Sequence, residues 1–375
     1  MFLELHMIQS FAPSNLNRDD TGNPKDTEFG GVRRARISSQ CIKRAIRREP
    51  IFAQTTQVPL GTRTRLLARK IADLLIAQGK DVDEAGEVAL SFAAAYSGKM
   101  DGERTSVLIY LSQEELHGMA EALLDVWEAA LLAARNPKDK KAQKVLEDLV
   151  KTLVKETRDH TSAPDIALFG RMLANDPKLN LDAALQVAHA ISTHRVNMDI
   201  DFFTAVDDLQ PREETGAGMM GVVAFNSACF YRYARLDWDQ LVANLDGDVA
   251  LARKTVEGFL RASLRAVPTG KQNSFAAQNP PSLALAVVRS DGMAWSLTNA
   301  FEAPVRPDRD GGYIAPSVQA LDVYWGRLTQ VYGGDHVTPI ALALESELPL
   351  ENLAGAVVPD VNTWVRCVLD KLPGA

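Results

Sequence analysis

The sequence has few cysteines, few aromatic residues and no long apolar run, and each shortage excludes a class of protein. Its 375 residues include 3 cysteines, and 7% are aromatic. Cys41, Cys229 and Cys367 lie far apart, which argues against a disulfide framework or a structural zinc site. No apolar run approaches the roughly 20 residues that span a membrane, and MFLELHMIQSFAPS does not read as a signal peptide. We therefore expect a cytoplasmic protein with no membrane partner, no metal and no cofactor.

Positive charge is also scarce overall, but it is concentrated near the start of the chain. There are 41 basic and 48 acidic residues, a formal net charge of -7. Such a balance does not by itself suggest a nucleic-acid partner. However, the segment Arg33 to Arg48, within GGVRRARISSQCIKRAIRR, holds seven Lys or Arg and no acid. A local basic face counts for more than the average charge of the chain.

The second half of this segment predicts an amphipathic helix. Ser38 or Ser39 is a suitable N-cap, and Ile42 and Ile46 have the spacing of an inward face. On the other side the cations stack in two rows, Lys43 with Arg47 and Arg44 with Arg48, each pair four residues apart. A helix start favours an anion, so this arrangement suits the phosphates of a nucleic-acid backbone. An ordinary solvated basic helix is the alternative interpretation.

The remaining pattern predicts a chain of mixed helices and strands. FLELHMI alternates like a strand, and SFAPSNLNRDDTGNPKDTEFGG predicts a polar loop of about twenty residues. From about Thr62 to Arg158 the pattern is mostly helical, with a capping box at Ser112 and Glu115. After it we expect strands at DIALFG, LQVAHAISTHRV, SACFYRYARL and LALAVVR, and late helices at SVQALDVYWGRLTQVY and NTWVRCVLDKL. In LQVAHAISTHRV the spacing of Val187, Ala188 and Ile191 also fits a helix, and the β-branched residues favour the strand. A long hairpin is expected between the second and third of these strands.

Three further groups of residues are candidates for a function. Phe202 and Phe203 are adjacent, so in a strand they point to opposite faces; one can meet a base, although two core positions are the simpler reading. PTGKQNSFAAQNP places Lys271 in a loop, where a phosphate contact and a plain turn are equally plausible. His189, His194, Asp207 and Asp208 show no catalytic or metal-ligand pattern, and structural roles are the better interpretation for them.

Taken together, these motifs resemble one protein family. The pattern LNRDD…KD..FGG.RR.RISSQ.(I/L)KRA.R is similar to the N-terminal signature of the backbone subunit of type I-E CRISPR surveillance complexes, the CasC component of Cascade. The resemblance continues, in order, through DIALFGRM, AHAISTH, DIDFFTAVDDL, FYRYA, VPTGKQNSFAAQNP, NAFE and PSVQALDVYW. It is looser between residues 60 and 160 and after Gly333.

The resemblance implies an α+β fold shaped like a right hand. Residues 1–59 and 165–375 are expected to form a modified RRM-like, ferredoxin-like palm, and residues 60–164 an inserted helical fingers domain. Residues 196–226 are expected to form a long β-hairpin, the thumb, within the palm segment.

The resemblance also implies a function without catalysis. Copies of the chain assemble head to tail along a guide RNA, the crRNA, together with other Cascade subunits. They grip its phosphates and displace bases at regular intervals, so that the guide can pair with target DNA in antiviral defence. The implied RNA-binding residues are Asn17, Arg18, Lys25, Ser38, Gln40, Lys43, Arg44, Arg47, Met172, Phe202, Phe203, Thr204, Lys271 and Arg306.

Two other functions remain open from the sequence. One is a metal-dependent endoribonuclease that uses an acidic residue of the polar loop SFAPSNLNRDDTGNPKDTEFGG, called the early loop below. The candidate residues are Asp19, Asp20 and Asp26. The other is a protein-only assembly scaffold, in which the basic helix contacts acidic surfaces of neighbouring subunits.

Overall fold

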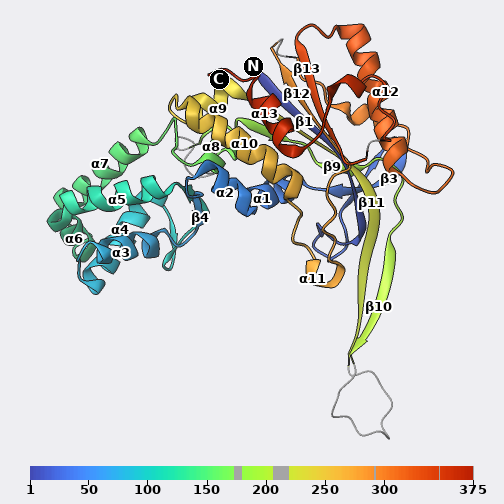
Figure 1. Ribbon diagram of the computed structural model, residues 1–375. Coiled ribbons are helices and arrows are strands. Elements are labelled where there is room, and N and C mark those ends of the chain that lie inside the picture. Colours follow the sequence, from blue (N-terminus) through green and yellow to red (C-terminus); the bar gives the residue numbers. More distant parts are fainter. Residues whose placement is uncertain (173–179, 206–218, 291–292, 346, 375) are drawn as a thin grey trace, which may run out of the picture. The chain divides into compact units, whose positions relative to one another are not determined.

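The computed structural model describes residues 1–172, 180–205, 219–290, 293–345 and 347–374, and the chain divides into two compact units (Figure 1). The first unit consists of Met1–Phe52, Gln186–Leu236 and Val256–Ala375, and the second of Ala53–Leu185 and Asp237–Thr255. Strands dominate the first and helices the second, which confirms the predicted α+β class. The helical unit therefore includes more of the chain than the predicted residues 60–164, and the terms palm, fingers and thumb stay predictions.

The first unit is built on a ten-stranded sheet formed by described residues. Most neighbours are antiparallel; β13 and β14 pair in parallel. Strands β8 (Leu185–Val187) and β10 (Asp199–Ala205) both pair with β11 beside the main path. That path runs β14 (Val357–Val358), β13 (Val337–Ala343), β12 (Leu283–Arg289), β1 (Phe2–Ser14), β11 (Met219–Asp237), β9 (Ala190–Ser192), β3 (Val32–Ile37) and β2 (Asp26–Phe29).

The residues of β1 are buried on both sides of the sheet, because helices cover both of its faces (Figure 1). Leu5 and Met7 line one small cavity together with residues of α1 (Ser39–Arg48) and α10 (Val249–Arg265). Ile8 points the other way and joins an apolar core with α12 (Ile314–Tyr332) and the 3-10 helix η2 (Leu297–Phe301). The strand expected at FLELHMI is thus confirmed; its alternating residues Leu3, Leu5 and Met7 are buried, and the intervening residues are buried as well.

A buried polar network lies on the α12 side of the sheet. Glu4 accepts hydrogen bonds from Tyr233 Oη (2.8 Å) and the Trp295 backbone N–H (2.7 Å), and forms an ion pair with Arg289 (2.5 Å). His6 Nδ1 lies 2.8 Å from the hydroxyl of Tyr231. Burial lowers the pKa of His6 to about 3, with a further contribution from the charge of Arg289. His6 is therefore neutral in the folded chain at physiological pH.

The second unit has a core of helices, as the sequence predicts. The capping box at the start of α5 is confirmed: Glu115 N donates to Ser112 Oγ, and Ser112 N donates to Glu115 Oε2. The apolar core is shared by α3 (Leu67–Ala77), α4 (Val82–Ser97), α5 (Gln113–Asp125), α6 (Trp127–Arg135) and α7 (Lys140–Glu156). Shorter elements of the chain are α2 (Pro50–Thr56), β4 (Thr62–Thr64), β7 (Ile109–Leu111), α9 (Trp238–Asn244), η3 (Ala354–Ala356) and α13 (Val361–Leu369).

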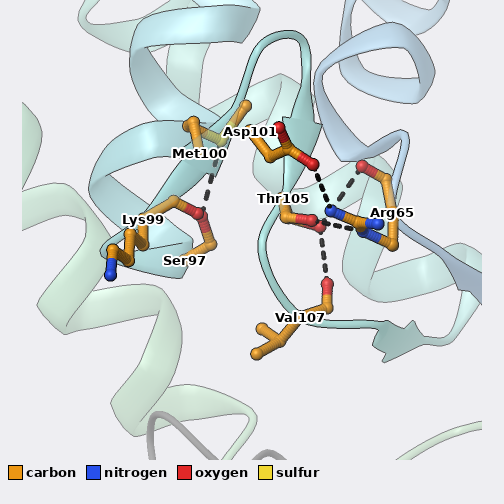
Figure 2. Close-up of polar contacts among 7 residues, drawn as sticks. All are labelled: Arg65, Ser97, Lys99, Met100, Asp101, Thr105 and Val107. Carbon is orange, nitrogen blue, oxygen red and sulfur yellow. Dashed lines mark hydrogen bonds and ion pairs between the residues drawn. The ribbon is translucent and has the colours of Figure 1, made fainter.

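One arginine fixes a small hairpin of the second unit to the residues before α3 (Figure 2). The hairpin consists of β5 (Met100–Asp101) and β6 (Arg104–Thr105). Arg65 Nε donates to the Thr105 carbonyl at 2.7 Å, and its Nη2 contacts Asp101 Oδ2 at 3.1 Å. Thr105 N–H donates to the Arg65 carbonyl at 2.8 Å. Through its contacts with Asp101 and Thr105, Arg65 therefore stabilises the position of this hairpin.

Two predictions about local structure are wrong. DIALFG was expected as a strand but lies in α8 (Pro164–Phe169), where Pro164 starts the helix and Gly170, at φ 77°, ends it. The polar loop is also shorter than the predicted twenty residues. β1 continues to Ser14 and β2 begins at Asp26, so the loop between them covers residues 15–25, about half of the predicted length.

Candidate nucleic-acid interface

The start of α1 is held by Ser38 and Asn17, two residues that the family resemblance implies in RNA binding. Ser38 is the N-cap, and its Oγ accepts from Cys41 N at 3.4 Å. Its own N–H donates to Asn17 Oδ1 at 2.8 Å. The N–H, the carbonyl, which accepts from Ile42 N, and the hydroxyl oxygen of Ser38 are all hydrogen-bonded within the protein, and the residue is only 7% exposed. Asn17 thereby fastens the early loop to the helix, and RNA contacts by these two residues stay predictions.

The cations of α1 differ in their exposure. Arg44 and Arg48 are exposed, as is Gln40, whereas Lys43 and Arg47 are half-buried. Burial lowers the pKa of Lys43, because desolvation disfavours its ammonium form. An anion beside Lys43 would raise this pKa again, because a nearby opposite charge favours the ammonium form.

A groove of about 550 Å³ brings several predicted residues together. Its walls come from the early loop, from α1 and from the loop before α11 (Gln272–Phe275). The thiol of Cys41 lies in this groove, and its pKa is raised by burial and lowered in part by the charges of Arg44 and Lys25. Lys25 also lines a small adjacent cavity. The groove is lined by Leu16, Asn17, Arg18, Asp19, Cys41, Arg44, Ala45, Arg48, Glu49, Val267, Pro268, Thr269 and Gly270.

The arginines before α1 serve the fold more than the groove. Arg34 is completely buried and donates to the carbonyls of Phe29, Ser192, Phe301 and Glu302 at 2.8–3.2 Å. These contacts correct the expectation that the whole basic run from Arg33 faces a ligand. In the same run, Arg33 pairs with Asp26, and Arg36 donates to the Asp26 carbonyl and contacts His189 Nδ1 at 3.0 Å.

The hairpin of β10 and β11 carries the predicted aromatic pair and extends away from the sheet (Figure 1). Phe202 is 76% exposed and Phe203 is 41% exposed, so the reading of both as core residues is wrong. The ring of Phe203 covers Gly221, where an added Cβ would lie 2.2 Å from the ring. A larger residue at position 221 would force the Phe203 ring to move from this place.

The two faces of the hairpin differ in character. Cross-strand partners share a face in an antiparallel pair, so Phe202 lies beside Val222, and Thr204 beside Met220. This first face carries no charged side chain among the described residues and is largely exposed; we call it the apolar face. Phe203 lies on the opposite face with Asp199 and Asp201. The apolar face consists of Ile200, Phe202, Thr204, Met220, Val222 and Ala224.

Three other predicted residues lie apart from the groove and the apolar face. Met172 is 85% exposed and belongs to the second unit. It follows Arg171, whose buried guanidinium pairs with Glu115 at 2.5 Å. Lys271 directly follows Gly270 of the groove wall and has a left-handed backbone, φ 50°. Arg306 is exposed in the segment that follows η2.

The acidic residues that a ribonuclease would need have other roles or stand alone. Asp19 Oδ1 accepts from the N–H groups of Thr21 and Asn23 at 2.9 Å each, which shapes the turn. The same oxygen accepts from the Thr21 hydroxyl at 2.8 Å. This hydroxyl bond lowers the pKa of Asp19 most, and the N–H bonds lower it further. Asp20 is exposed. Among the described residues, no group of three His, Cys, Asp or Glu is arranged to hold a metal ion; Asp207 and Asp208 lie outside them.

The two histidines also have structural explanations. His194 Nε2 accepts from Cys229 N at 3.1 Å, its Nδ1 lies 2.7 Å from the Arg195 carbonyl, and its ring stacks on Tyr313 at 3.8 Å. Burial lowers the pKa of His189, and the charges of Arg36 and Lys25 lower it further. Both rings are thus held by neighbours, and the ring nitrogens of His194 contact backbone groups of Cys229 and Arg195.

Comparison with known proteins gives one family and two similar structures. The sequence profile of the family described as "CT1975-like protein" matches residues 3–361. One similar structure is a "CRISPR RNA-guided surveillance complex, pre-nicking", with a TM-score of 0.85 and 32% identity over 99% of both chains. Another, a "CRISPR RNA-guided surveillance complex", has a TM-score of 0.77 and 28% identity over 99% of this chain and 100% of that chain. Comparison with curated proteins gave no match.

Proposed function

We propose, from the premise that this chain belongs to the CT1975-like protein family and is a Cascade backbone-type protein, that it binds a guide RNA as a repeating structural subunit. Copies of the chain line up along the crRNA within a surveillance complex that contains other Cascade subunits, in the cytoplasm. The guide then pairs with target DNA in antiviral defence. None of these steps requires the chain itself to break a covalent bond.

The observation that carries this proposal is the contrast between two surfaces of the first unit. The groove beside α1 offers Arg18, Arg44 and Arg48 to an anion. The apolar face of the hairpin offers Phe202 and its neighbours, without charge, to a base. A single-stranded nucleic acid has these two parts, a charged backbone and flat bases, and its binders combine a cationic groove with stacking platforms.

In this proposal the two surfaces divide the work. Phosphate contacts hold the strand and carry no sequence information. Phe202, Phe203 and Thr204 displace a base at each hairpin, and the bases between hairpins stay available. Base pairing with the target then supplies the specificity, as in other RNA-guided systems. Met172, Lys271 and Arg306 are proposed as further contacts.

Assembly along the guide follows from an interface of the head-to-tail type. Such a contact joins different surfaces of successive copies and extends without closing. The number of copies is then set by the length of the RNA. Shortening a synthetic guide should therefore reduce the mass of the purified particle in steps of one 41.0 kDa chain.

The test is to reverse two charges in α1 and to measure binding of a guide RNA to the full chain. We expect Lys43→Glu with Arg47→Glu to weaken binding about equally for guides of different sequence and to reduce its dependence on salt. Loss of assembly with unchanged RNA binding would instead support the protein-only scaffold. Guide cleavage that is lost in Asp20→Ala, with binding retained, would support the endoribonuclease.

A further inference from the structure

One buried asparagine joins the base of the hairpin to the wall of the groove beside α1. Asn15 is completely buried at the end of β1. Its Nδ2 donates to the Ala224 carbonyl in β11 at 2.9 Å and to the Gly22 carbonyl in the early loop at 3.0 Å. Since both partners are carbonyl oxygens, only the amide NH₂ group satisfies them. One side chain therefore links the loop that lines the groove to the hairpin.

A second link comes from the short turn around α11. Gly270 approaches the early loop so closely that an added Cβ would lie 2.3 Å from the Leu16 carbonyl oxygen. The turn is bounded by Lys271 at φ 50° and Ala276 at φ 48°, a conformation that residues other than glycine rarely adopt. Such outliers persist only where the surrounding structure holds them. The turn is thus held against the groove wall.

The same turn reaches the hairpin through an aromatic contact. The ring of Phe275 lies 5.5 Å from the ring of Phe225 in β11. Phe225 is the residue next to Ala224, which Asn15 binds. Ala224 and Phe225 pair with Ile200 and Asp199, the first residues of β10. Both links therefore meet the hairpin at the point where it leaves the sheet.

Beyond this point, within the described residues 199–205 and 219–223, β10 pairs only with β11. Residues Asp199–Ala205 are all exposed, and an isolated two-stranded ribbon is only marginally stable in water. The direction of the ribbon is consequently determined at its base. We propose that Asn15 and the turn Lys271–Ala276 form a positioning element that fixes the apolar face relative to the groove. On the proposed function, this element sets which nucleotide of the bound guide is displaced.

The experiment uses the full chain assembled on a synthetic guide RNA with the other complex subunits. Nucleotides displaced by the hairpin should acylate more readily at their 2′-hydroxyl groups, giving a periodic pattern. Asn15→Leu keeps the size of the side chain and removes both donors without adding charge. Asn23→Leu is the matched control, because Asn23 lies in the same loop and its Nδ2 donates to the Thr21 hydroxyl.

We expect Asn15→Leu either to shift the periodic pattern along the guide or to lower, at least threefold, the ratio of reactivity between displaced and intervening nucleotides. RNA affinity should change less than about threefold. Phe275→Leu should have the same effect. Phe275→Tyr, which keeps the ring, should keep the wild-type pattern. Melting temperatures identify any variant that has simply unfolded, and Phe275→Leu then decides the question if Asn15→Leu fails to fold.

An unchanged pattern in folded Asn15→Leu and Phe275→Leu would overturn the positioning element while leaving the proposed function intact. A pattern that Asn23→Leu alters equally would overturn it as well, because the effect would then belong to the loop. A wild-type particle without bound RNA or without periodicity would instead contradict the proposed function, and this inference with it.

Discussion

The α1 groove and the hairpin, two parts of one unit, present opposite kinds of surface. At the groove, the polar groups nearest the helix start are used internally: Ser38 caps α1 and Asn17 holds Ser38. Cations remain at its rim, among them Arg44 and Arg48. At the hairpin, the apolar face exposes apolar side chains and carries no charged side chain in the part that the structure describes. A phosphate needs the first surface and a base the second, so the comparison predicts different responses to salt.

The strongest way to break this comparison is charge reversal in the groove. Arg44→Glu with Arg48→Glu, the two exposed α1 cations that line the groove, should weaken guide binding by about 100-fold or more, since two contacts to charged groups are worth ~3 kcal/mol together. The slope of log affinity against log salt should fall by about 1.4, because each phosphate contact with a single strand contributes ~0.7. Filter binding over a salt series measures both quantities. Arg69→Glu with Lys70→Glu on α3 is the control, and an equal loss there would show a nonspecific charge effect.

Truncating the apolar face should give a smaller effect of a different kind. Phe202→Ala removes an exposed stacking platform, for which losses of ~1–3 kcal/mol per base are typical, so we expect about tenfold weaker binding. The salt slope should stay unchanged, because no charge is removed. Phe203→Ala should likewise weaken binding at an unchanged salt slope, because Phe203 is the other aromatic residue proposed to displace the base and carries no charge. A changed slope in Phe202→Ala would contradict the division between the two surfaces.

The sheet that supports both surfaces should lose stability in acid through His6. The pKa of His6 is lowered to about 3 in the folded chain, while an unfolded histidine titrates near 6.5. The unfolded state therefore binds the extra proton first, and this contribution is complete above about pH 6.5 and is lost as pH falls toward 3. Below pH 6 the loss approaches ~1.4 kcal/mol per pH unit.

Denaturant unfolding of the wild type and of His6→Asn between pH 7 and 4 measures this contribution. The difference in unfolding free energy between the two should shrink as the pH falls. His336→Asn, at an exposed position, serves as the control. A constant difference across this range would show that His6 does not govern the acid response.

The smallest expected effect separates capping from RNA contact at Ser38. Ser38→Ala should lower the free energy of unfolding by ~1 kcal/mol through loss of the N-cap. The salt slope of RNA binding should be unaffected, because the substitution removes no charge. Ser112→Ala, which removes the cap of α5 in the other unit, should cost a similar amount. A reduced affinity in Ser38→Ala alone, at equal stability, would place Ser38 in contact with RNA after all.

The sequence predicts the parts of this structure that depend on local pattern. The cap and inward face of α1, the capping box of α5 and the pairing of β10 with β11 all follow from spacing, because each is decided by residues close in sequence. The prediction of a strand at DIALFG fails although Pro164 and Gly170 signal a helix start and end. A short apolar run is ambiguous between the two structures.

The remaining features depend on partners that are distant in the sequence. Arg34 reads as one more cation of a basic run, but it reaches carbonyls 158 and 267 residues away and is buried. Asn15 lies in a polar stretch with several similar amides, and the structure alone shows its bond to Ala224. Gly270 has no local signal that it must pass the Leu16 carbonyl. Long-range contacts of this kind leave no periodicity in one sequence.

The most direct test of the central claim is the composition of the purified particle. The chain is expressed with a CRISPR-repeat transcript and the other complex subunits, and the absorbance ratio and the mass by light scattering are recorded before and after ribonuclease treatment. A large particle rich in RNA, which loses mass in ribonuclease and contains more copies on a longer guide, is the predicted result. A nucleic-acid-free monomer or dimer, unchanged by ribonuclease, would contradict the account.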